Sequence, residues 1–251
     1  MAEHTREHRS LLAAAEKRAL VAIAHRLPAA VNSDHLTALA LVAMAMAGVG
    51  YAFARWDVRA LWLAVVALAL NWFGDSLDGT VARVRKVERP RYGFYVDHVL
   101  DIVGATFLFV GLAASGFMTP WIALALLIAY LLVSGEVFLA TSVRGVFKMS
   151  FSGFGPTELR ILLAIGTLAL FRDPHVDLGV LGRPRLFDFG GLIAIAGMAV
   201  ALTVNVVRNA TELARLEPRR RINHEVHEGH EDRAENRSVR LQADCARSVR
   251  L

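Results

Sequence analysis

Apolar residues in this chain are gathered into six long runs, separated by short polar segments. Along the chain the runs cover roughly residues 35–54, 59–80, 95–115, 119–142, 157–171 and 188–207. A helix of about 17 to 25 apolar residues is long enough to cross the hydrocarbon core of a bilayer. The fifth run is the shortest of the six. The pattern predicts an all-α integral membrane protein, built as a bundle of six transmembrane helices.

The two ends of the chain follow other patterns. Between Leu11 and Leu27 apolar residues recur at helical spacing among charges, which predicts an amphipathic helix lying on the membrane surface and stopped by Pro28. A plain solvated helix is the alternative. Beyond Pro218 mixed charge replaces the apolar pattern, as is typical of a disordered tail. We therefore expect three parts: an N-terminal cytoplasmic segment at 1–33, a six-span membrane domain at 34–208, and a basic, charged, disordered cytoplasmic tail at 209–251.

Composition and charge agree with a membrane protein. The chain is 55% hydrophobic, with a mean hydropathy of +0.43, which is unusual for a soluble domain of 251 residues. Its net charge of +5 comes from bases beside the apolar runs, where they set topology and attract anionic lipid; no nucleic-acid recognition motif accompanies them. Eighteen Lys and Arg residues flank the runs on one side and five on the other. The positive-inside rule places both termini and the segment Arg83–Arg91 in the cytoplasm.

Four aspartates lie within or beside the second and third runs: Asp75, Asp78, Asp97 and Asp101. On helices, the three-residue and four-residue spacings place each pair on one face, about one turn apart. A carboxylate near the apolar slab costs a few kcal/mol on insertion scales, so four of them need compensation. Clustered oxygen ligands suit hard divalent cations such as Mg²⁺, Mn²⁺ or Ca²⁺, and two such ions suit phosphoryl transfer. A cation transporter that uses the carboxylates as an ion path is a different reading of the same residues.

Small residues accompany the aspartates at Gly79, Ala82 and Gly93. They would let a nucleotide or pyrophosphate approach the backbone, although close packing of membrane helices explains small residues equally well. Arg83 offers a fork of donors suited to phosphate, or serves as an interfacial anchor. The combination with the aspartates favours a phosphate site.

The complete spacing resembles the full signature of the CDP-alcohol phosphotransferase family. It reads Asp75-x-x-Asp78-Gly79-x-x-Ala82-Arg83, nine residues, then Gly93-x-x-x-Asp97-x-x-x-Asp101. The resemblance implies a membrane enzyme of phospholipid synthesis that displaces CMP from a CDP-linked donor with a lipid or alcohol hydroxyl. It also implies a possible homodimer and, for a chain this short, a bacterial inner membrane.

The resemblance implies roles for individual residues. The four aspartates would bind two Mg²⁺ or Mn²⁺ ions, and Asp101 would also accept the proton of the attacking hydroxyl. The CDP site would be shaped by the remaining signature residues, Gly79, Ala82, Arg83 and Gly93. Because a carboxylate engaged by metal is a poor base, His98 is a second candidate for that role; alternatively its ring packs against another span.

Two residue pairs bear on the branch of the family. Asp97-His98 and Thr157-Glu158 are similar to pairs in the branch that uses CDP-choline or CDP-ethanolamine with diacylglycerol. Glu158 would then contact substrate, although it could equally complement the dipole in the first turn of a helix. These pairs favour a CDP-aminoalcohol donor, and the alternative is CDP-diacylglycerol with a small polar alcohol as acceptor. Glu136, a carboxylate inside the fourth run, is a further candidate for a functional residue.

Overall fold

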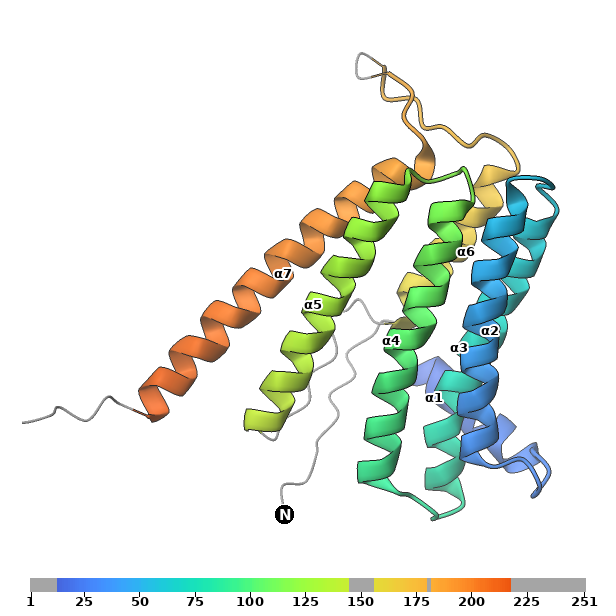
Figure 1. Cartoon of the computed structure of the whole chain (residues 1–251). Helices are drawn as coiled ribbons and strands as arrows, with labels where there is room; N and C mark the ends of the chain where they lie inside the picture. The colour runs from blue at the N-terminus through green and yellow to red at the C-terminus, as the bar shows by residue number, and fades with distance from the viewer. Residues whose placement is uncertain (1–12, 145–155, 180–181, 218–251) are drawn as a thin grey trace, which may run out of the picture. The chain divides into compact units, whose positions relative to one another are not determined.

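The computed structural model describes residues 13–144, 156–179 and 182–217, and within them the chain is helical, with no strand (Figure 1). The predicted all-α class is confirmed. Seven helices are present in these ranges: α1 (Ala13–Arg26), α2 (Ser33–Ala54), α3 (Ala60–Val84), α4 (Pro90–Ala114), α5 (Pro120–Arg144), α6 (Pro156–Leu170) and α7 (Leu186–Leu216).

Five of the described helices, rather than six, are long and apolar enough to cross a membrane: α2, α3, α4, α5 and α7. The expected count of six is therefore not confirmed. The fifth predicted run became α6, which has 15 residues and a length of about 22 Å at 1.5 Å per residue, short of the roughly 30 Å hydrocarbon core. It starts at Pro156 and ends before the polar segment Arg172-Asp173-Pro174.

A helix does form at the predicted N-terminal position. Leu20 and Ala24 on α1 are buried in one cluster with Leu77 and Val81 of α3, so this face of α1 packs against protein. The placement of α1 on a membrane surface stays a prediction.

Helix α2 packs against both α3 and α4 and so sets their positions. Small residues make the approach close: a Cβ added at Gly111 of α4 would overlap the backbone of Gly48 on α2. A Cβ at Gly74 of α3 would lie 2.6 Å from the carbonyl oxygen of Leu36 on α2. Packing of this kind, backbone against backbone, is characteristic of membrane helices. These contacts hold both α3 and α4 close to α2.

The loop between α3 and α4 is tied to the start of α2. Arg85 donates hydrogen bonds to the carbonyl oxygens of Leu27 (3.1 Å) and Val31 (2.5 Å), in the segment between α1 and α2. Arg89 pairs with Asp34 at 2.5 Å, and this hydrogen bond raises the pKa of the Arg89 guanidinium above its ordinary value. The loop that joins the two halves of the signature is therefore anchored both to the segment before α2 and to the first turn of α2.

Helix α7 continues beyond the predicted end of the sixth run. Residues 209–216, which the sequence placed in the tail, are helical, because good helix formers such as Glu212, Leu213 and Ala214 follow the apolar run. The rest of the predicted tail, from 218 on, lies outside the described residues. Contacts between Cα atoms divide the chain into two units, Met1–Val207 and Arg208–Leu251, and the candidate site lies in the first.

Candidate active site

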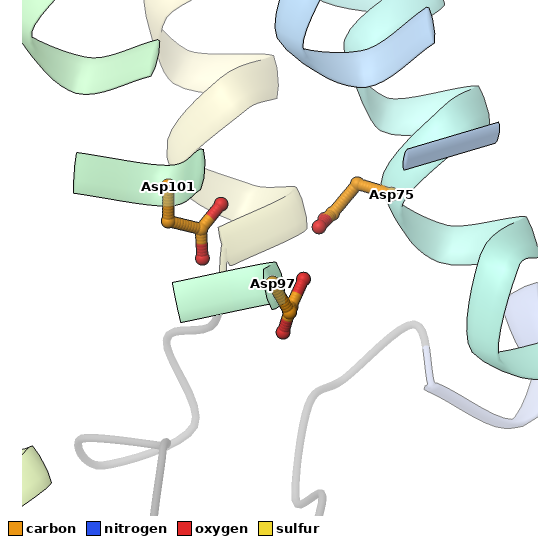
Figure 2. A group of neighbouring side chains, drawn as sticks. All are labelled: Asp75, Asp97 and Asp101. Atoms are coloured by element: carbon orange, nitrogen blue, oxygen red, sulfur yellow. The ribbon is translucent and has the colours of Figure 1, made fainter. Parts of the chain in front are cut away.

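Three of the four signature aspartates meet between α3 and α4. Asp75 comes from α3, Asp97 and Asp101 come from α4, and one carboxylate oxygen of each lies within 4.8 Å of the other two (Figure 2). All three are partly buried. Asp97 and Asp101 share a face of α4 because they are four residues apart, as the spacing predicts. The packing of α2 against α3 and α4 then brings Asp75 opposite them.

Asp78 lies outside this group of three. Its Oδ2 accepts a hydrogen bond of 2.7 Å from Thr37 Oγ1, and its Oδ1 accepts one from the backbone N–H of Gly79. Its backbone carbonyl accepts a further bond from Ser33 Oγ. The first turn of α2 thus orients this aspartate.

The segment around Asn32 therefore has two roles. Asn32 caps α2 in a capping box with His35. Ser33 and Thr37, one position and five positions on, contact Asp78, a role that the sequence did not indicate. Nothing in the local pattern distinguishes these hydroxyls from ordinary first-turn residues.

Arg160 is the principal site residue that sequence reasoning missed. Its Nη2 lies 2.7 Å from Oδ2 of Asp75, and the two side chains are only 18% and 22% exposed. In the sequence it counted only as a topological charge. Its place within the short fifth run, rather than before it, is the signal that could have identified it, because a charge inside an apolar run needs a partner.

Glu16 links α1 to α3 and α6, the two helices that carry the ion pair between Asp75 and Arg160. Oε1 of Glu16 accepts hydrogen bonds of 2.9 Å from Trp72 Nε1 of α3 and from Thr157 Oγ1 of α6. Trp72 is three positions before Asp75, and Thr157 is three positions before Arg160. Glu16 therefore helps to hold α6 against α3, one helical turn from the carboxylates.

His98 is packed between α4 and α5. It is 6% exposed, and its ring lies 4.1 Å from that of Phe94 and 4.7 Å from that of Phe138, measured between centroids. Its Nδ1 lies 2.7 Å from the carbonyl oxygen of Phe94, which can only accept, so Nδ1 carries a proton and donates it there. The same nitrogen is 3.7 Å from Oδ2 of Asp97. These contacts favour the packing interpretation of the ring.

The residues expected at the CDP site have different surroundings in the structure. The guanidinium of Arg83 lies over Gly79, where an added Cβ would be 3.2 Å from Nη1, and Arg83 Nη2 donates to Thr80 Oγ1 at 3.1 Å. Gly79 therefore provides the space that this side chain occupies. Ala82 is half-buried, whereas Gly93 is exposed, with no atom within 4 Å of an added Cβ. The side chain of Glu158 lies outside the described residues.

Glu136 lies on α5, and its Oε2 is 3.4 Å from Nδ2 of Asn205 on α7. The carboxylate thus joins these two helices in the first unit. No ligand chemistry follows from this contact alone.

The donor set of the cluster suits a hard divalent cation. Three carboxylates supply only oxygen ligands, and Arg160 pairs with one of them, Asp75. Three carboxylates gathered at a partly buried position in apolar helices repel one another. Bound divalent cations would offset that repulsion.

Comparison with known proteins agrees with this chemistry. The family model described as CDP-alcohol phosphatidyltransferase matches residues 31–207, from the start of α2 into α7, and so includes every signature position. No curated protein matches the chain at a significant level. Because the model covers most of the chain, and its span includes the carboxylate cluster, this protein belongs to the CDP-alcohol phosphatidyltransferase family.

Proposed function

We propose that this protein transfers a phosphoaminoalcohol group from a CDP-aminoalcohol to diacylglycerol and releases CMP, with two Mg²⁺ or Mn²⁺ ions as cofactors. Family membership makes the chain an integral membrane transferase of substituted phosphate groups in phospholipid synthesis, and the family uses divalent metals. The proposal adds the substrates, the ions and the residue roles. The observation that carries it is the convergence of Asp75, Asp97 and Asp101 from two helices.

In this proposal the three clustered aspartates hold the ions, and Asp78 completes the set as the fourth signature carboxylate. When bound, the ions would neutralise the donor diphosphate and make CMP a better leaving group. Thr37 fixes the orientation of Asp78, and Arg160 balances part of the negative charge. Gly79, Ala82, Arg83 and Gly93 border the CDP, and Glu158 contacts substrate.

We assign the proton transfer to Asp101. The acceptor hydroxyl oxygen attacks the β-phosphorus of the donor, the bond from that phosphorus to the oxygen of CMP breaks, and the hydroxyl proton passes to the Asp101 carboxylate. His98 is the second candidate. Because its Nδ1–H is directed at the carbonyl oxygen of Phe94, only Nε2 could take the proton.

The choice of donor rests on Asp97-His98 and Thr157-Glu158. The alternative within the family is CDP-diacylglycerol with a small polar alcohol, which uses the same carboxylates. A cation transporter, the third reading of the sequence, does not account for membership of a transferase family.

For the membrane domain at 34–208, the distribution of Lys and Arg supports an orientation with the site and both termini at the cytoplasmic face. We place it in a bacterial inner membrane on the basis of the family resemblance. There a soluble CDP-linked donor reaches the aspartates from the cytoplasm, while a lipid acceptor arrives through the bilayer. We also propose a homodimer, on the basis of the family resemblance.

The test is CMP release by the purified protein in lipid with Mg²⁺ or Mn²⁺. CDP-choline, CDP-ethanolamine and CDP-diacylglycerol are each supplied with a matched acceptor. Metal-dependent release from one of the first two would support the proposed branch, and release from CDP-diacylglycerol alone would select the alternative.

Replacement of a single clustered carboxylate tests the metal assignment. Asp97→Asn should lower CMP release by at least about 100-fold, because an amide oxygen is a weaker ligand and leaves the ions undercompensated. The matched control is Asp173→Asn, which removes an aspartate from an exposed ion pair with Arg183 in the loop between α6 and α7. Full activity of Asp97→Asn would contradict the assignment.

A further inference from the structure

We propose that Arg160 is an exchangeable counter-ion. It pairs with Asp75 until a metal ion binds there, and its guanidinium then pairs with the diphosphate of the CDP-linked donor. The inference rests on the proposed function, because it takes Asp75 as a metal ligand. It adds a residue from α6, outside the signature, to the site.

The contact itself is the first argument. Arg160 Nη2 and Asp75 Oδ2 are 2.7 Å apart, a charge-assisted hydrogen bond between two side chains that are both about four-fifths buried. An arginine keeps its charge at every accessible pH, so this cation cannot be neutralised by losing a proton. A metal ion at Asp75 must therefore compete with the guanidinium for the same oxygen.

The second argument concerns the position of the guanidinium after it leaves Asp75. A partly buried cation without an anion is strongly unfavourable, so the guanidinium needs a new partner nearby. Asp97 and Asp101 belong to the same metal-binding group, and the proposed function assigns Asp78 to the ions as well. The substrate brings a further anion, the diphosphate, and a guanidinium fork matches phosphate oxygens well.

The third argument is that the backbone beneath Arg160 is secured by other contacts. Thr157, three positions earlier on α6, is bonded to Glu16, which is in turn bonded to Trp72 of α3. Helix α6 therefore has an attachment to α3 that is independent of the ion pair. The long arginine side chain can change partner by rotation about its own bonds while α6 keeps its place.

The charge balance agrees with the exchange. The four carboxylates of the proposed ligand set and Arg160 carry a formal charge of −3 without metal. Two divalent ions would change this sum to +1, and a bound diphosphate with two negative charges would bring it to −1. The metal ions and the nucleotide would therefore bind cooperatively, with Arg160 changing partner between the two events.

The exchange predicts that loss of Arg160 changes the affinities for Mn²⁺ and for CDP in opposite directions. In lipid nanodiscs, calorimetry would measure Mn²⁺ binding without nucleotide, and then CDP binding at saturating Mn²⁺, for wild type and Arg160→Gln. Arg160→Gln should bind Mn²⁺ about tenfold more tightly, because a competing charged hydrogen bond is gone, and CDP about tenfold more weakly. The matched control Arg183→Gln, which removes the 2.6 Å pair with Asp173, should change neither affinity.

If Arg160 had a merely structural role, Arg160→Gln would bind both Mn²⁺ and CDP more weakly, and that result would overturn the inference. Unchanged Mn²⁺ affinity in Arg160→Gln would overturn it as well. Arg160→Lys covers the case in which the glutamine variant fails to fold. It keeps a cation beside Asp75, so Mn²⁺ affinity should stay within about twofold of wild type, while the loss of the fork weakens CDP binding about fivefold. Wild-type affinity of this variant for CDP would overturn the phosphate role.

The same measurements separate this inference from the proposed function. Mn²⁺ binding by wild type that is lost in Asp97→Asn supports the metal site itself, whatever Arg160 does. Absence of Mn²⁺ binding by folded wild type would contradict the proposed function, and the exchange at Arg160 with it.

Discussion

Two aspartates of the signature are engaged by side chains from other helices. Thr37 of α2 holds Asp78, and Arg160 of α6 holds Asp75. Neither partner belongs to the signature, yet each one fixes the orientation of a carboxylate that does. At the scale of single residues, the site therefore depends on contacts that cross between helices far apart in the chain.

Thr37→Val tests one of these contacts with almost no change in side-chain volume. Loss of the hydroxyl removes a hydrogen bond to a charged acceptor, worth about 1.5–3 kcal/mol, so kcat/KM should fall by about tenfold or more. CMP release and thermal unfolding are measured together. The control is Thr203→Val on α7, whose hydroxyl donates to the carbonyl oxygen of Ala199 on its own helix. Equal activity of the two variants would remove Thr37 from the site.

At the scale of elements, three further helices support the two that carry the carboxylates. Helix α2 supplies small residues that let α3 and α4 approach it closely, α6 supplies the partly buried cation of Arg160, and α1 ties α3 to α6. The shortness of α6 is consistent with its role as a carrier of Arg160 and Thr157. Two predictions separate these contributions.

Glu16→Ala should loosen the attachment of α1. It deletes one acceptor that serves both Trp72 and Thr157, which should lower the free energy of unfolding by about 1–3 kcal/mol. Activity should fall with it, because α6 carries Arg160. Glu16→Gln keeps an oxygen acceptor and should therefore retain most of the stability and activity. The control is Lys17→Ala, at the adjacent exposed position. Thermal unfolding in detergent and CMP release are measured for each variant. No effect of Glu16→Ala on either would contradict the role of Glu16 in holding α6 against α3.

Gly111→Ala should separate α2 from α4. The added methyl group overlaps the backbone of Gly48, and overpacking of this kind costs about 1–3 kcal/mol. Because α4 carries Asp97 and Asp101, metal affinity should fall as well. Gly197→Ala is the matched control, since nothing lies within 4 Å of a Cβ at that position. Unfolding temperature and Mn²⁺ titration are the measurements, and identical behaviour of the two variants would refute the packing argument.

At the scale of the whole molecule, the open question is which face of the membrane the site occupies. Lys and Arg are distributed so unequally that the positive-inside rule gives one orientation, with the termini and the α3–α4 loop in the cytoplasm. Because α6, at the fifth predicted run, is too short to count as a clear span, this orientation calls for an independent test.

Cys245, the single cysteine of the chain, provides that test. A membrane-impermeant maleimide should label it only after the inner membrane is permeabilised, because the C-terminus is predicted to be cytoplasmic. The double variant Asp177→Cys/Cys245→Ser moves the cysteine to an exposed position between α6 and α7, and should be labelled in intact spheroplasts. The reverse pattern would invert the topology and place the site on the outer face.

The sequence by itself determined the helical class, the positions of the long helices and the pairing of Asp97 with Asp101. These depend on local spacing, on apolar length and on the 3.6-residue period, which a single segment carries. The signature also identified the family before any fold was known.

Only the tertiary structure decided which groups meet. It brought Asp75 to Asp97 and Asp101, placed Asp78 with Thr37 outside that group, and introduced Arg160 and Glu16. Contacts between distant segments depend on how closely helix backbones can approach, and that is set jointly by small residues on several helices, so no single stretch of sequence could specify them.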